Sequence, residues 1–228
     1  IEIANKLKEA NYIRNEEAQQ LAEWDMFDQN SSSPFFDPEW MFGVGDGFDV
    51  VIGNPPYVFA RDAHFSIDFK KQIEKDYFSK LSKNAKSKAN QSGKINLFAL
   101  FIMKGIMVST KNGILSYIVP NNILRTTTYD LIRKYILDNT SVGQIVDLGS
   151  GVFEKVTAST IILQLTNKVQ TNNEVLILTD VKKLNEIDAT IKNISQSQFI
   201  YNTSYAFNIF GDMKSIMLTR KIDENAIL

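Results

Sequence analysis

Asn54, Pro55, Pro56 and Tyr57 are the residues whose types and spacing point most directly to chemistry. Each proline ring fixes its own φ and removes a backbone donor, and the residue before a proline is held extended. The run therefore presents rigid backbone carbonyls beside the side-chain carbonyl of Asn54, and two such acceptors fit an amino group with two hydrogens. Tyr57 adds a flat face on which a planar base can stack.

This arrangement suits methylation of an exocyclic amine. Such a nitrogen is a poor nucleophile because its lone pair is conjugated into the ring. Two acceptors free that lone pair and stabilise the positive charge that develops, provided that a methyl donor is held in line. The structural alternative is a proline-rich turn that closes a strand. The apolar run "FDVVIG" directly before the motif makes the chemical interpretation the stronger one.

The elements around the motif predict a doubly wound α/β sheet. The run 48–53 is typical of a strand in a parallel sheet, where ligands bind beyond the carboxyl ends. We expect further strands at 113–120, 142–149, 158–166 and 174–181. We expect helices at 1–10 and 15–24 and within 66–81, 95–110 and 121–139. Asn121 or Asn122 is the expected N-cap of the last helix. No helix separates the last two strands, so at least one is expected to be antiparallel at an edge.

Composition excludes several classes of function. The 228 residues carry 25 basic and 26 acidic side chains, no cysteine and one histidine, His64. Disulfides, thiolate metal sites and histidine clusters are therefore excluded, and we expect no metal. No apolar run reaches membrane-spanning length and no signal peptide is visible, which predicts a cytoplasmic location without a membrane. Eight lysines between Lys70 and Lys94 form either a solvated surface or an arm that contacts phosphates.

Longer stretches carry a family resemblance. "GFDVVIGNPPYV", with "WDMFDQNSSSPFFDPEWMFGV" before it and "GILSYIVPNNIL" and "IVDLGSGVFEKVTASTIILQL" after it, resembles the adenine-specific DNA methyltransferases of the type IIG restriction-modification family. The resemblance covers most of residues 17–167. It implies S-adenosylmethionine as cofactor and double-stranded DNA as partner, with the target adenine turned out of its stack.

The resemblance also implies roles for single residues. Asn54 and Pro55 would accept from the adenine amine, and Tyr57 would stack on the flipped base. Phe153 would pack on the other side of the base or edge-on to it. Phe98, a weaker match, would line the pocket for the adenine of the cofactor.

One expected part is missing from the sequence. In the resembling family, a strand, a glycine-rich loop and a helix that hold the cofactor come before the Asn-Pro-Pro-Tyr strand. Only 47 residues precede that strand here, and they show no such unit. The run "IVDLGSGVF" is the permuted alternative, but β-branched, strand-like residues follow it instead of a helix. The prediction is half of a doubly wound Rossmann-like S-adenosylmethionine-dependent methyltransferase fold, inactive by itself.

This interpretation divides the chain into three parts. Residues 1–47 form a helical and loop lead-in, 48–186 the catalytic part without the cofactor-loop half, and 187–228 a tail toward a target-recognition domain. The chain begins with Ile1 rather than methionine, so we expect a piece of a longer protein. The strand at 48–53 would then lie at an exposed edge, which predicts a homodimer or a local rearrangement there.

Two other functions stay open. A degenerate methyltransferase fold that only binds DNA or a partner would explain the missing cofactor loop. Methylation of a protein glutamine amide also uses Asn-Pro-Pro-Tyr. The lysine-rich insertion, the extra strands and the tail argue against that second alternative.

Overall fold

The computed structural model describes residues 38–59, 67–81, 96–152, 159–179, 181 and 189–210. The chain divides into two compact units, Ile1–Asp46 and Gly47–Leu228. In the first unit, the described helix is α3 (Pro38–Phe42), after which the amides of Gly43 and Val44 donate to the carbonyls of Glu39 and Pro38. The two helices predicted at 1–10 and 15–24 lie outside the described residues.

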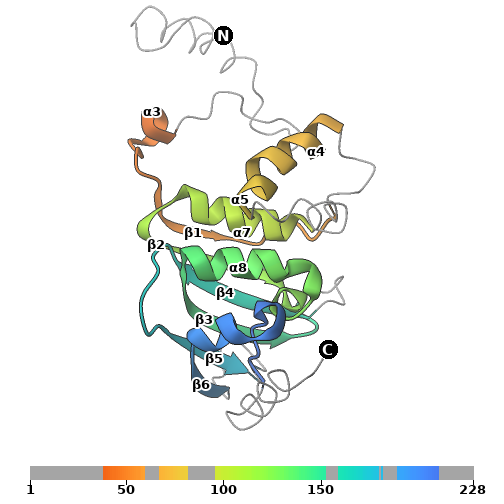
Figure 1. The fold of residues 1–228 in the computed structure, drawn as a ribbon. Helices are drawn as coiled ribbons and strands as arrows, with labels where there is room; N and C mark the ends of the chain where they lie inside the picture. Colours follow the sequence, from red (N-terminus) through yellow and green to blue (C-terminus); the bar gives the residue numbers. More distant parts are fainter. Residues whose placement is uncertain are drawn as a thin grey trace, which may run out of the picture. The chain divides into compact units, whose positions relative to one another are not determined.

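The second unit is built on a mixed sheet (Figure 1). Its described strands lie in the order β1-β2-β4-β3-β5-β6. Their bounds are β1 (Phe48–Gly53), β2 (Ser109–Pro120), β3 (Ser141–Gly149), β4 (Thr160–Thr166), β5 (Glu174–Thr179) and β6 (Thr190–Ser195). The pairs β1–β2 and β3–β5 are parallel and the others antiparallel. The five predicted strands are confirmed, and β1 is an edge strand as expected.

The prediction of an antiparallel strand among the last two is confirmed by β4, but its predicted position at an edge is wrong. Neither of the last two predicted strands lies at an edge, because β4 pairs antiparallel with β2 and with β3, and β5 lies between β3 and β6. β4 runs antiparallel to β3, and its apolar residues pack between two longer strands. The antiparallel edge strand is β6, which comes from the tail that the sequence left unassigned.

Helices follow the predicted ranges with one exception. The predicted range 66–81 holds α4 (Ile67–Ile73), the π-helical turn η1 (Glu74–Phe78) and α5 (Ser79–Leu81), and the range 95–110 holds α7 (Leu97–Val108). In the range 121–139, two 3-10 turns, η3 (Asn121–Leu124) and η4 (Thr127–Tyr129), come before α8 (Asp130–Asn139). Asn121 and Asn122 are therefore not the N-cap of α8. Three successive threonines disfavour helix, and Thr126 is extended at ψ 130°.

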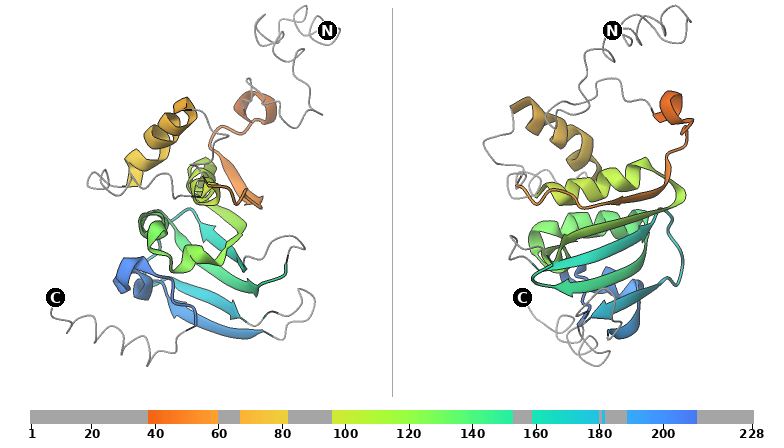
Figure 2. Two further views of the ribbon diagram at one scale, coloured as in Figure 1. Left: turned by 90° about the vertical axis from the view of Figure 1, so that its right-hand side faces the viewer. Right: turned by 180° about the vertical axis from the view of Figure 1, so that it is seen from behind.

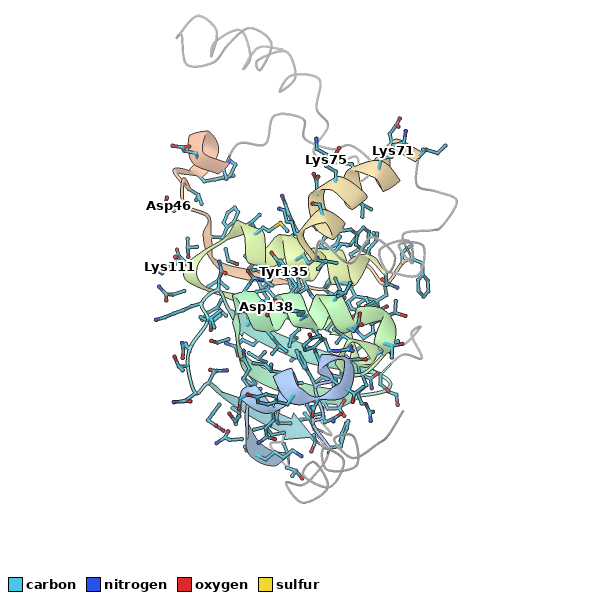
Figure 3. The ribbon with its side chains drawn as sticks, viewed as in Figure 1. Asp46, Lys71, Lys75, Lys111, Tyr135 and Asp138 are labelled. Atoms are coloured by element: carbon cyan, nitrogen blue, oxygen red, sulfur yellow. The ribbon has the colours of Figure 1, made fainter. Side chains whose placement is uncertain are left out.

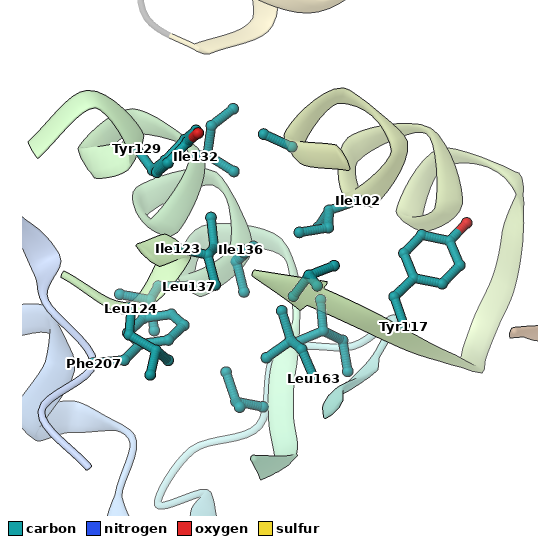
Figure 4. Packing of buried hydrophobic residues seen from close by; sticks show 14 of the residues in the cluster. Ile102, Tyr117, Ile123, Leu124, Tyr129, Ile132, Ile136, Leu137, Leu163 and Phe207 are labelled. Atoms are coloured by element: carbon teal, nitrogen blue, oxygen red, sulfur yellow. The ribbon is translucent and has the colours of Figure 1, made fainter. Parts of the chain in front are cut away.

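The core lies between the helices and one face of the sheet. Figure 2 shows α7, α8 and α9 (Ser197–Tyr201) on the same side of the strands. Buried side chains of alternate strand positions, such as Leu115, Ile145 and Leu163, meet Ile102, Ile132 and Ile136 of the helices (Figure 4). In the described ranges, no helix is long and apolar enough to cross a membrane.

Two glycines fit β1, β2 and α7 closely around the ring of Tyr117. A Cβ built at Gly53 would lie 3.3 Å from Tyr117 Cε1, and one at Gly105 would lie 2.9 Å from Tyr117 Oη and overlap Leu115 Cδ1. Gly53 is also the register partner of Tyr117. The carboxyl end of β1 is therefore packed closely against the Tyr117 ring.

Candidate functional site

The Asn-Pro-Pro-Tyr motif begins where β1 leaves the sheet. The register of β1 with β2 ends at the pair Gly53 and Tyr117. Beyond it, Asn54 and Pro56 are exposed, Pro55 is buried and Tyr57 is half-buried. The side-chain amide of Asn54 is thus exposed to solvent at the carboxyl end of a strand, which is the place where α/β sheets bind ligands.

The other end of the motif is fixed to the start of α7. The amide of Leu97 donates to the carbonyl of Val58 over 2.7 Å, and Phe59 forms an antiparallel bridge with Asn96. The side chain of Asn96 caps α7 by accepting from the amide of Phe98 over 3.4 Å. Asn54 to Tyr57 are consequently held between two anchors.

Tyr57 is fixed at its tip and along one edge. Its hydroxyl donates to the carbonyl of Ile118 over 3.0 Å. Its ring meets the ring of Phe98 edge-on, with centroids 6.3 Å apart and planes at 85°. Burial raises the pKa of the Tyr57 hydroxyl. The hydroxyl is therefore protonated at neutral pH and available as a donor.

Phe98 lies behind the motif. It is 0% exposed and contacts Tyr57 on one side and Tyr129 on the other, where the ring centroids are 5.2 Å apart. Burial raises the pKa of Tyr129, and a hydrogen bond with the backbone of Asn96 opposes that rise. Phe98 contacts a motif residue in this arrangement, and its contact with a cofactor stays a prediction.

The second glycine-containing run forms a turn between strands. Gly149 and Gly151 have φ of 66° and 85°, and the Asp147 carboxylate accepts from the amide of Gly149 over 3.1 Å. The chain then returns as β4, antiparallel to β3. A cofactor loop would be followed by a helix. The run "VTASTIILQLT" contains the strand β4 instead, so its interpretation as a strand is confirmed. Phe153 lies outside the described residues.

Other polar groups near the motif form no metal site. Within the ranges that the structure covers, no group of three or more His, Asp or Glu side chains could hold a metal ion.

Lys71 and Lys75 are exposed on α4 and η1 (Figure 3). Lys71 lies 3.7 Å from the Asp68 carboxylate, which reduces the local positive charge. Residues 82–94 of the lysine-rich segment are outside the described part, and phosphate contact stays a prediction.

Sequence reasoning missed Ile118 and Tyr129. The signal for Ile118 was indirect, because the prolines remove backbone donors beside β2 and so leave a carbonyl there to be satisfied by another group. Tyr57, two residues after Pro55, was the nearest candidate donor. Tyr129 followed three threonines and carried no comparable sequence signal.

Comparisons with known proteins place this site in a family. Residues 2–153 match the Eco57I restriction-modification methylase family. The type II methyltransferase M.AccI of Acinetobacter calcoaceticus is 30% identical over 164 residues, which are 69% of this chain and 28% of that protein. The type II restriction enzyme and methyltransferase RM.Eco57I of Escherichia coli is 27% identical over 137 residues, 60% of this chain and 13% of that enzyme.

Solved structures agree on the fold. The type IIG restriction endonuclease BpuSI matches with a TM-score of 0.52 and 16% identity, over 70% of this chain and 20% of its own. The type I methyltransferase subunit from Streptococcus thermophilus matches with a TM-score of 0.50 and 22% identity, over 81% of this chain and 40% of its own. The predicted class, half of a doubly wound Rossmann-like methyltransferase fold, is confirmed.

The chain spans less than a third of the length of the curated relatives named above. With its family match over residues 2–153, this chain belongs to the Eco57I restriction-modification methylases.

Proposed function

We propose that this chain supplies the target-base site of an adenine-specific DNA methyltransferase in a restriction-modification system. The observation that carries the proposal is the exposed Asn54 amide, at the carboxyl end of β1 and three residues before a Tyr57 ring fixed by Ile118 and Phe98. Asn54 and the Pro55 carbonyl accept from the adenine amine, and Tyr57 stacks on the base. Phe153 closes the other side of the base. Double-stranded DNA is the partner, with the base flipped.

We infer that the site for S-adenosylmethionine lies largely outside the described residues. The turn at Gly149 and Gly151 leads into an antiparallel strand, and Phe98 is wholly buried. When bound, S-adenosylmethionine supplies the methyl group of this family. The residues of this chain orient the base and polarise its amine, with no step beyond that.

Methyl transfer by the complete gene product tests the function. With isotopically labelled S-adenosylmethionine and duplex DNA, we expect label in N6-methyladenine after digestion to nucleosides. Label in cytosine would overturn the choice of adenine, and label in a protein glutamine would favour the amide alternative. No transfer at all would favour the non-catalytic module. Calorimetric titration of the 228-residue chain with S-adenosylmethionine is expected to show no binding.

We also propose that the β1 edge pairs with a second copy of the chain. Val50 and Ile52 are exposed on one face of β1, Ile52 to 79%, and Ile114 of β2 lies beside Val50 in the register. Within β1 itself there is no proline and one charged residue, Asp49, a composition that favours antiparallel pairing of two edges.

Sedimentation at increasing concentration tests this edge. We expect dimers of the wild-type chain, and Ile52→Lys is expected to weaken association by about tenfold or more because the lysine charge would be desolvated. Ile191→Lys on β6 is the matched control, since Ile191 is 57% exposed at the opposite edge of the described sheet. A wild-type chain that stays monomeric, or equal loss in both variants, would count against pairing through β1.

A further inference from the structure

We propose that Phe98, backed by Tyr129, is a positioning residue that fixes the Tyr57 ring, together with the Ile118 carbonyl, in the orientation that receives the target base. The proposal rests on the proposed function, because it assigns a purpose to the orientation of Tyr57. It gives Phe98 a role through Tyr57 instead of a contact with a cofactor.

The first step is the acceptor that the prolines leave behind. β1 and β2 are parallel up to Gly53 and Tyr117, and Ile118 is the next residue of β2. To continue the ladder, a residue after Gly53 would have to donate a backbone N–H, and Pro55 and Pro56 have none. The Tyr57 hydroxyl donates to the Ile118 carbonyl instead, over 3.0 Å. The bond is part-buried, and it satisfies a carbonyl that the ladder leaves unpaired, so it favours one placement of the ring tip.

The second step is the support along the ring. A hydroxyl bond fixes the tip of a tyrosine and still permits the ring to tilt. Phe98 prevents the tilt because it meets the Tyr57 ring edge-on at 85°, a preferred aromatic geometry. Phe98 itself has no freedom to move, since it is 0% exposed and packed against Tyr129.

The third step concerns the first turn of α7, which carries Phe98 and also holds the backbone after the motif. Phe98 is in the first turn of α7, and the same turn anchors Val58 through Leu97. Tyr129 contacts the Phe98 ring, and Asn96 caps the same turn by accepting from the amide of Phe98. One helix start therefore fixes both the main chain after the motif and the ring inside it.

A fluorine on the Tyr57 ring tests the positioning. With 3-fluorotyrosine at position 57 of the full chain, we expect one 19F resonance well separated from that of free fluorotyrosine. Phe98→Leu is expected to move the resonance at least half of the way to the free value. Phe101→Leu is the matched control, because Phe101 is an exposed phenylalanine of the same helix, and it is expected to leave the resonance in place. An unmoved resonance in folded Phe98→Leu would overturn the proposal.

A second probe covers the case in which Phe98→Leu does not fold. With 3-fluorophenylalanine at position 57, the ring keeps its contact with Phe98 and loses its hydroxyl. The resonance is expected to broaden or divide, and an unchanged sharp line would overturn the role of the Ile118 carbonyl.

Base binding separates this proposal from the proposed function. Duplex DNA with an extrahelical 2-aminopurine is titrated onto the chain, and stacking on Tyr57 quenches its fluorescence. Phe98→Leu is expected to weaken this binding about tenfold while Phe101→Leu does not. If the wild-type chain gives no quenching, the base site fails, and the fluorine resonances still decide whether Phe98 positions Tyr57.

Discussion

Asn54→Ala in the complete gene product is expected to lower kcat for methyl transfer by about 10²- to 10³-fold, the usual loss when one preorganised polar group of a transition state is removed. The Asn54 side chain is exposed at the end of β1. In the proposed function it accepts from the amine as positive charge develops there. The effect belongs to the transition state, so the Kd for S-adenosylmethionine is expected to stay unchanged.

Two variants make this test specific. Asn54→Asp keeps an acceptor oxygen at the same place and is expected to retain part of the activity. Asn193→Ala removes an exposed asparagine of β6 and is expected to have no effect. Single-turnover rates and calorimetry separate chemistry from binding. A kcat for Asn54→Ala within about threefold of wild type would show that the amide has no part in the chemistry.

Arg133→Met is expected to lower the free energy of unfolding by about 3–5 kcal/mol, since it leaves one buried and several part-buried carbonyls without their donor. Arg133 of α8 is 0% exposed. Its guanidinium donates to the carbonyls of Ile123, Thr126, Ser204 and Tyr205 over 2.7–3.1 Å. Burial lowers its pKa to about 10, which still leaves the group charged at neutral pH.

These bonds join segments that are far apart in the sequence. They hold the turns before α8 against the segment at Ser204 and Tyr205, where φ is 55° at both residues, a backbone conformation that costs about 1–2 kcal/mol per residue. The amide of Phe207 donates to the carbonyl of Leu124 in the same contact. Without the guanidinium, the left-handed pair loses the bonds that hold it.

The neighbouring Lys134→Met is the control for Arg133→Met. Lys134 forms an ion pair with Asp138, a residue labelled in Figure 3, at 2.7 Å, and both side chains are partly exposed. Such a pair contributes about 0.5 kcal/mol or less, so little change is expected. Urea denaturation of both variants gives the comparison. A loss below about 1 kcal/mol for Arg133→Met would show that the carbonyls find other partners.

Local residue types determined much of this protein. Val50 to Ile52 and the prolines after Gly53 were enough to predict a strand that ends in a rigid, acceptor-rich turn, because side-chain branching and proline geometry act within a few residues. The apolar run at 97–108 was enough to predict a buried helix. The prediction that the 47 residues before β1 hold no cofactor loop likewise came from spacing along the chain.

Only the tertiary structure decided which groups satisfy one another. The place of β4 inside the sheet, the start of α8 at Asp130 and the pairing of β6 depend on contacts between distant segments. The same holds for Arg133, whose acceptors are up to 72 residues away, and for Tyr57, whose acceptor is 61 residues away. A buried carbonyl takes whichever donor the fold brings to it, and residue type alone does not name that donor.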